Sequence, residues 1–115
     1  MIRIRRIYDP EETGEQYKVL IDRFWPRGIS KETSGWNEWI KEIAPSDSLR
    51  KWFAHDPGKW EEFKKRYGNE LTKKQEVLKK LKQLEYLQGT LTLLFAAKDK
   101  EHNNAVVLRE MLEEY

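Results

Sequence analysis

Hydrophobic residues near the start of the chain predict two β-strands. Isoleucines nearly alternate with arginines over residues 2–7, a pattern typical of a half-buried strand. Residues 17–24 hold an apolar run that ends in charged residues, and they predict a second strand. Turn-forming residues over 9–16 join the two. Because this connection is too short for a normal crossover helix, we expect the two strands to form an antiparallel pair.

Apolar residues at helical spacing predict three helices in the middle of the chain. The first begins at Ser34, its N-cap, and ends at Ala44-Pro45. Ser46 caps a short second helix, and Asp56 caps a third in which Pro57 takes the first position. We expect the aromatic side chains of these helices to fill the core, with base stacking as the alternative for an exposed ring. The rings concerned are Trp36, Trp39, Trp52, Phe53, Trp60, Phe63 and Tyr67.

A long helix and a central strand are predicted in the second half of the chain. Gly68-Asn69 is expected to break or bend the third helix. Leucines between positions 71 and 84 continue a long amphipathic helix that ends at Gly89. Residues 90–97 are continuously apolar, which is typical of a central strand covered by helices.

These elements predict an α/β fold: a small single domain over residues 1–115, with a three-stranded, mostly parallel sheet flanked by helices. A final helix begins at Asn103 or Asn104 as its N-cap. The strands over 17–24 and 90–97 are separated by a long, mostly helical segment. We therefore expect these two strands to be parallel neighbours joined by a right-handed connection.

Composition excludes several classes of function. The chain has no cysteine, so it has no disulfide, no cysteine-ligated zinc and no thiolate nucleophile. Its 22 basic and 20 acidic residues nearly cancel, so charge alone does not indicate a nucleic acid or a membrane as partner. No apolar run approaches the roughly 20 residues of a membrane span, and no signal-peptide core follows Met1. We therefore expect a cytoplasmic protein with no membrane partner; the pattern predicts no oligomeric state.

Charged and polar residues follow both central strands, at the ends where parallel α/β sheets bind ligands. Asp22, Arg23 and Arg27 follow the first of these strands, and Lys98 and Asp99 follow the second. If the strands are parallel neighbours, the two segments enclose one crevice. Its cationic groups and the nearby helix N-terminus indicate a small anionic ligand. The candidate ligand-binding residues are Arg23, Trp25, Arg27, Lys98, Asn103 and Asn104.

Three residues around the crevice are candidate catalytic groups, namely Asp22, Asp99 and His102. A carboxylate or an imidazole there would act as a base or a proton carrier. Mg²⁺ held by Asp22 and Asp99 is a further hypothesis, because only water is evident as a nucleophile; no other cofactor is expected. A lone histidine in a polar loop is more often simply solvated, and His55 and His102 lack the spacing of a metal site.

The same residues also have purely structural interpretations. Asp22 and Arg23 are typical of an ion pair at a strand end. Arg27, between a proline and a glycine, is also typical of a simple turn. Asn103 and Asn104 are typical of helix caps. Lysine runs on the helices alternate with glutamates, which indicates solvated faces or, alternatively, a diffuse nucleic-acid footprint.

Several segments resemble the YeaO-like branch of a large family of domains of unknown function: RIYDP, VLIDRFWPRG, APSDSLRKWFAHDPGKWEEFKKRY and GTLTLLFAAKDKEHNNAVVL. The resemblance covers nearly the whole chain and implies a small cytoplasmic α/β domain with no agreed substrate. Asn104 stands where many members have histidine. More distant branches join the first two strands in parallel through a helix, and often carry cysteines that are absent here. The signature positions are Asp22, Arg23, Trp25, Pro26, Arg27, Gly28, Trp52, Phe53, His55, Asp56, Pro57, Trp60, Lys98, Asp99 and Asn103.

Three functions remain open from the sequence. The first is an anion-binding α/β domain, in one version an enzyme acting on a phosphorylated or carboxylated metabolite. The second is a nucleic-acid or protein-binding module that uses the lysine-bearing helices. The third is a domain whose signature residues only hold the fold together. For the first we expect Asp22 to approach Lys98, and the Arg27 side chain to project from its loop.

Overall fold

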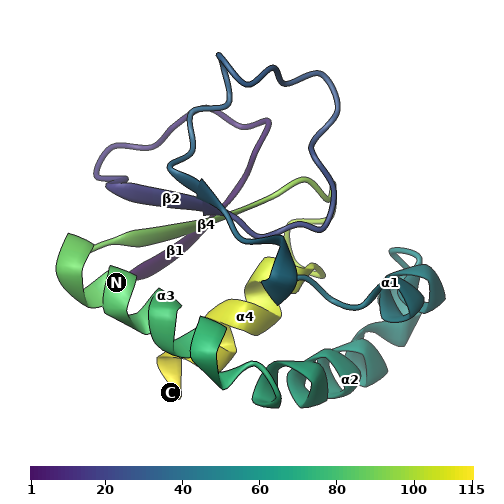
Figure 1. The fold of residues 1–115 in the computed structure, drawn as a ribbon. Coiled ribbons are helices and arrows are strands. Elements are labelled where there is room, and N and C mark those ends of the chain that lie inside the picture. Colours follow the sequence, from purple (N-terminus) through teal and green to yellow (C-terminus); the bar gives the residue numbers. More distant parts are fainter.

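The four β-strands form one parallel sheet in the order β1-β4-β2-β3 (Figure 1). The computed structural model describes all residues 1–115. Its strands are β1 (Ile2–Arg6), β2 (Tyr17–Leu20), β3 (Glu38–Trp39) and β4 (Leu91–Phe95). β4 lies between β1 and β2, with Leu93 opposite Ile4 on one side and Val19 on the other. The predicted α/β fold and the parallel pairing of β2 with β4 are therefore confirmed, and the sheet has one strand more than expected.

The helices begin and end largely where capping residues predict. Ser46 Oγ accepts a hydrogen bond from Leu49 N at 3.2 Å, and Asp56 Oδ1 accepts one from Gly58 N at 2.9 Å. Gly89 ends α3 with a φ of 83°, a left-handed conformation that favours glycine. The helices are η1 (Lys41–Ile43), α1 (Asp47–Phe53), η2 (Pro57–Lys59), α2 (Trp60–Thr72), α3 (Gln75–Gln88) and α4 (Asn104–Glu113). None of them is long and apolar enough to cross a bilayer.

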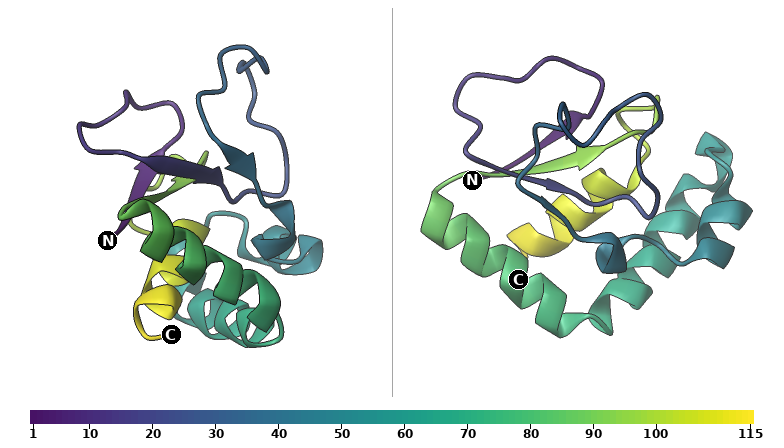
Figure 2. Two further views of the ribbon diagram at one scale, coloured as in Figure 1. Left: turned by 60° about the vertical axis from the view of Figure 1, so that its left-hand side comes forward. Right: turned by 45° about the horizontal axis from the view of Figure 1, so that its top comes forward.

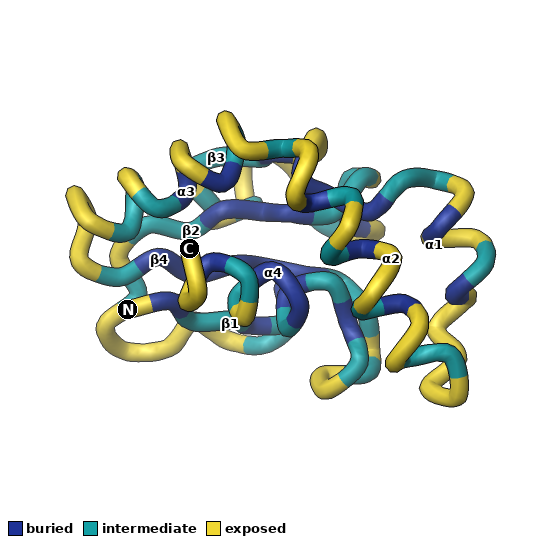
Figure 3. Tube along the Cα trace, turned by 90° about the horizontal axis from the view of Figure 1, so that it is seen from below, coloured by how far each residue is buried: buried dark blue, intermediate teal, exposed yellow.

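The sheet is covered differently on its two faces (Figure 2). The helices pack against one face, where Leu91, Leu93 and Phe95 of β4 join the main core. Long loops cover the other face, where Leu94 packs with Leu20 in a smaller cluster. Every residue of β4 is buried, as expected for a central strand, whereas the outer turns of the helices are exposed (Figure 3). The buried rings include Phe53 and Phe63; Trp52 and Trp60 are only partly buried, which is less than their spacing predicts.

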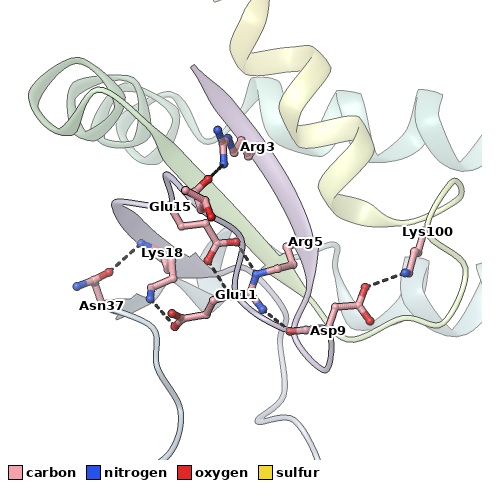
Figure 4. A network of polar contacts seen from close by, with 9 residues as sticks. Arg3, Arg5, Asp9, Glu11, Glu15, Lys18, Asn37 and Lys100 are labelled. Atoms are coloured by element: carbon pink, nitrogen blue, oxygen red, sulfur yellow. Dashed lines mark hydrogen bonds and ion pairs between the residues drawn. The ribbon is translucent and has the colours of Figure 1, made fainter.

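The antiparallel pairing that we expected for β1 and β2 is wrong. Both strands run parallel to β4, which lies between them. The connecting loop crosses over without a helix because a buried ion pair holds it in place. Arg5 donates to both carboxylate oxygens of Glu15, at 2.5 and 3.1 Å, and to the carbonyl of Asp9 at 2.8 Å (Figure 4). The loop thus takes the place of the usual crossover helix.

The helix predicted between Ser34 and Pro45 is also wrong. This segment contains the short strand β3, which pairs with β2, and the single turn η1. Its apolar residues divide between the two faces of the sheet: Trp36 and Trp39 pack with the smaller cluster, and Ile40 joins the main core. A helix would present these side chains on one face only. Because they pack on both faces of the sheet, the segment is mostly irregular.

The expected break at Gly68-Asn69 does not occur, because α2 continues to Thr72. Gly68 lies against α4, where a β-carbon would come within 3.9 Å of the Met111 methyl group. A β-carbon at that distance would make an ordinary van der Waals contact, so the glycine is tolerated inside the helix and does not end it. The chain turns at Lys74 instead, whose ammonium group donates to the carbonyl oxygens of Glu42 and Ala44.

Candidate functional site

The carboxyl ends of β1, β4 and β2 open into a cavity of about 950 Å³, here called the strand-end cavity. Asp22 and Lys98 both line it, as the parallel arrangement predicts. So do all the other sequence-predicted site residues, which are Arg23, Trp25, Arg27, Asp99, His102, Asn103 and Asn104. Further lining residues that the sequence did not single out for this site include Arg6, Tyr8, Phe24, Arg50, His55 and Phe63.

Asp22 is held by two donors and has no cationic partner. Its Oδ2 accepts a hydrogen bond from Ala96 N at 2.9 Å, and its Oδ1 accepts one from Asn104 Nδ2 at 3.0 Å. Burial raises the pKa of this carboxyl above its usual value, and the two hydrogen bonds oppose that shift only in part. Arg23 forms no ion pair with Asp22; it donates to the Pro45 carbonyl at 2.9 and 3.2 Å. The structural ion pair considered from the sequence is therefore absent.

The two asparagines after β4 have different positions. Asn103 is the N-cap of α4: its Oδ1 accepts from Val106 N at 3.2 Å. Its Nδ2 donates to the Asp99 carbonyl at 3.0 Å, and the residue is only 2% exposed. Both ends of its amide therefore serve the fold, which argues against the predicted ligand-binding role. Asn104 lies in the first turn of α4 and fixes the Asp22 carboxylate.

Asp99 and His102 form a hydrogen-bonded pair at the rim of the cavity. His102 Nδ1 lies 2.8 Å from Asp99 Oδ2, while Asp99 Oδ1 accepts from the backbone N–H groups of Glu101 and His102. These bonds, led by the one from Glu101, hold the pKa of the Asp99 carboxyl below its usual value. The imidazole also packs edge-on against Trp60, with ring centroids 5.1 Å apart. Asp99 and Trp60 together fix the orientation of the His102 ring.

Positive charge dominates the cavity lining. It holds five basic side chains against two acidic ones. Arg27 and Lys98 are exposed, and neither side chain forms a hydrogen bond or an ion pair within the chain. Arg6 donates only to the Ala97 carbonyl, at 3.1 Å, and Arg23 only to the Pro45 carbonyl. Four of the five cations therefore have no carboxylate partner; the exception is Arg50, which pairs with Asp47.

Two exposed aromatic rings lie at the cavity, each beside an arginine. Phe24 is 57% exposed and has the Arg50 guanidinium 4.9 Å from its ring centroid. Tyr8 is 43% exposed, with Arg6 4.8 Å from its ring centroid. The Tyr8 hydroxyl donates to the Arg27 carbonyl at 2.8 Å, so it fixes the backbone of that loop and leaves the Arg27 side chain unrestrained.

Trp25, a predicted ligand-binding residue, is mainly engaged within the fold. Its indole N–H donates to the Ile29 carbonyl at 2.6 Å. Its ring packs edge-on against Trp36 and Trp39, at centroid distances of 4.8 and 5.6 Å. Trp25 therefore anchors the loop that carries Phe24 and Arg27, although part of it still lines the cavity.

A backbone outlier lies at the cavity wall. Ala54 and His55 have φ values of 47° and 57°, the left-handed region that non-glycine residues rarely adopt. This turn follows α1 and brings His55 to the cavity, near enough to Asp22 for its charge to favour the ionised carboxylate. Backbone strain of this kind is often retained at functional sites.

Magnesium on Asp22 and Asp99, one of the sequence hypotheses, fits these residues poorly. Mg²⁺ prefers several oxygen ligands in near-octahedral geometry. Both carboxylates already accept hydrogen bonds from N–H donors, and the cavity lining contains no third carboxylate. No group of three or more metal-ligating side chains occurs anywhere in the chain.

Comparison with known proteins places the chain among uncharacterised relatives. A family model described as "Inactive DUF488-N3 subclade" matches residues 1–115. The chain is 40% identical over 111 residues to the Uncharacterized protein YeaO of Escherichia coli K12, covering 96% of each chain. It is 34% identical over 113 residues to the Uncharacterized protein Rv3073c of Mycobacterium tuberculosis H37Rv, covering 96% of this chain and 92% of that protein. No solved structure matches. The resemblance to the YeaO-like branch is confirmed.

Proposed function

The chain belongs to the DUF488 family, in the subclade described as inactive, and we propose that it binds a small anionic metabolite in the strand-end cavity without converting it. One observation carries this proposal. Four cationic side chains around a single cavity have no carboxylate partner, and two of them, Arg27 and Lys98, make no polar contact at all. Unpaired cations that line a concave surface attract anions and raise their local concentration.

The shape and position of the cavity support a small ligand. Its volume of about 950 Å³ lies within the range of roughly 300–1,000 Å³ that is common for small-molecule sites. It opens at the carboxyl ends of parallel strands, where α/β folds bind ligands. The Arg27 guanidinium suits a phosphate or a carboxylate group, because it can donate two parallel hydrogen bonds. Lys98 would add a point charge beside it.

Catalysis is the second candidate, and the Asp99–His102 pair is the observation that favours it. A carboxylate that orients an imidazole is a common acid–base arrangement, and Asp22 has a raised pKa in the same cavity. Two observations favour binding over turnover. The cavity lining contains no serine, threonine or cysteine, and the matching family model is described as inactive.

A nucleic-acid partner along the lysine-bearing helices has weaker support. Three of the seven lysines in those runs pair with carboxylates, among them Lys64 with Glu61 on α2 and Lys82 with Glu85 on α3. Lys80 pairs with Glu38 of β3. Such pairing reduces the positive potential of the helical faces, whereas the cations of the strand-end cavity remain uncompensated.

An NMR titration with inorganic phosphate tests the proposal. In the wild-type chain, phosphate should shift the amide signals of residues 22–25, 27, 96–99 and 102–104, which line the cavity. Lys98→Gln should weaken this binding several-fold, because it removes an unpaired cation. Lys79→Gln is the matched control: Lys79 is exposed on α3, away from the cavity, and should leave binding unchanged. Absence of cavity shifts at millimolar phosphate, or equal effects of both variants, would refute the proposal.

Incubation with p-nitrophenyl phosphate separates binding from turnover. Binding without conversion predicts no release of nitrophenolate above the rate in buffer alone. Release that disappears in a His102→Gln variant would assign catalysis to the Asp99–His102 pair. The binding proposal would then give way to the catalytic alternative.

A further inference from the structure

We propose that the occupant of the strand-end cavity is a nucleoside phosphate, whose base stacks on Phe24 while its phosphate lies against Arg27 and Lys98. This inference rests on the proposed function and narrows its ligand class. It combines three features of one cavity: an exposed aromatic ring, unpaired cations and a fixed carboxylate acceptor. Together they match a planar ring, an anionic group and hydrogen-bond donors within one ligand.

Phe24 is the first of these features. A phenylalanine that is 57% exposed leaves a large apolar ring in water, although its loop neighbours turn inward. Pro26 is buried, and Trp25 is anchored by its bond to the Ile29 carbonyl and by two neighbouring tryptophans. The loop is therefore held by its other residues, and the Phe24 ring is left to the cavity.

Stacking on such a ring is a common way to bind nucleobases. Every base has a flat π-surface, so an exposed aromatic ring accepts bases with little sequence preference. The Arg50 guanidinium beside the Phe24 ring adds a cation that strengthens stacked arrangements. Tyr8, also exposed and flanked by Arg6, provides a second ring at the same cavity. Neither ring is needed to bind a simple phosphate.

Asp22 is the third feature. Each of its carboxylate oxygens accepts one hydrogen bond from the chain, so each keeps capacity for another. Ala96 N and Asn104 fix the position of the carboxylate, and no arginine or lysine forms an ion pair with it. Ribose hydroxyls and the amino groups of bases are donors that can use this capacity. A ligand that offered only anionic groups would leave this capacity unused.

Calorimetric titration of the full chain can test this inference with four probes: AMP, CMP, ribose 5-phosphate and inorganic phosphate. We expect both nucleotides to bind about tenfold more tightly than ribose 5-phosphate, the gain that one stacked base typically supplies. Phe24→Leu should remove this difference and leave ribose 5-phosphate binding unchanged. Phe24→Tyr, which keeps the ring, should retain it. Tyr86→Leu is the control, because Tyr86 is 87% exposed on α3 and lies outside the cavity.

The outcomes separate this inference from the proposed function. If the nucleotides and ribose 5-phosphate bind equally, the inference fails, but the anion-binding function stands. If none of the four probes binds, both fail. A 5′-phosphorylated trinucleotide distinguishes two sources of the nucleoside phosphate. Tighter binding than AMP indicates the end of a nucleic-acid strand, and weaker binding indicates a free nucleotide. Equal loss of nucleotide binding in Phe24→Leu and Tyr86→Leu would also overturn the inference.

Discussion

Asn104 Nδ2 donates a hydrogen bond to Asp22 Oδ1 at 3.0 Å, and so joins the segment after β2 to the first turn of α4. Both residues line the strand-end cavity, and the bond fixes the more buried of its two acidic side chains. Asn104 therefore serves mainly to orient the Asp22 carboxylate, and its amide lies beside that carboxylate.

Asn104→Ala should destabilise the chain and raise the Asp22 pKa further. The variant removes a donor from a buried carboxylate, and a loss of this kind costs about 1–3 kcal/mol. The same hydrogen bond lowers the Asp22 pKa, so its removal should move the titration of that carboxyl upward. Urea denaturation and carboxyl-detected NMR titration measure the two effects. An unchanged Asp22 titration would show that the bond does not form in solution.

The raised pKa of Asp22 predicts the sign of a pH effect on stability. Its ordinary value is 3.8, and burial raises it in the folded chain. At a pH between 3.8 and the pKa of Asp22 in the folded chain, the folded state binds more protons than the unfolded state. The contribution of Asp22 to stability is therefore complete below about pH 3.8. It is lost as pH rises through the folded pKa.

Comparison with Asp22→Asn isolates that effect, because asparagine does not titrate. The stability of the wild type relative to this variant should fall as the pH rises above about 3.8, as measured by urea denaturation at each pH. A relative stability that instead increases with pH would mean that the hydrogen bonds from Ala96 and Asn104 outweigh burial.

Ala54→Gly should stabilise the fold by roughly 0.5–1 kcal/mol. Ala54 ends α1 with a φ of 47°, where its β-carbon is strained and glycine is not. Ala105→Gly is the matched control in the first turn of α4, where the same change should destabilise by about 1 kcal/mol or more. Thermal or urea unfolding measures both. If Ala54→Gly is destabilising, the turn does not carry the strain that its dihedral angles indicate.

Phe63→Ala should cost about 3–5 kcal/mol, the range for large buried aromatic residues. The Phe63 ring is 2% exposed and stacks on Phe53 at a centroid distance of 4.2 Å. Trp60→Ala should cost less, because Trp60 is only partly buried. Chemical denaturation of both variants checks the order. A Trp60→Ala loss within about 0.5 kcal/mol would make that ring available to a ligand.

Local signals in the sequence predicted much of the fold. The continuous apolar run of β4 indicated a central strand, and the long helical segment before it indicated that β2 and β4 are parallel. The caps at Ser46, Asp56 and Gly89 mark helix ends in the structure. The wrong predictions depend on tertiary contacts. The Arg5–Glu15 ion pair that holds the β1–β2 loop joins residues ten positions apart, and no periodicity reveals it.

The wrong prediction of an antiparallel β1 also explains why some residues of the cavity were not predicted. An antiparallel β1 would end on the opposite side of the sheet, so Arg6 and Tyr8 were not expected beside Asp22. In the parallel arrangement the end of β1 lies at the cavity. Arg50 reaches it only through the packing of α1, which the sequence pattern does not specify. The segments after β2 and β4 were found because both follow strands that were correctly predicted as parallel.

In the proposed function, Arg27 binds an anion and does not support the fold. Calorimetric titration with pyrophosphate compares the affinities of the wild type and Arg27→Lys. Their melting temperatures show whether the substitution changes the stability of the fold. The Arg27 side chain makes no polar contact, and a lysine cannot form two parallel hydrogen bonds. We predict melting temperatures within about 3 °C of each other and roughly tenfold weaker pyrophosphate binding by the variant. A melting temperature many degrees lower, with pyrophosphate affinity unchanged, would show that Arg27 supports the fold and does not bind the anion.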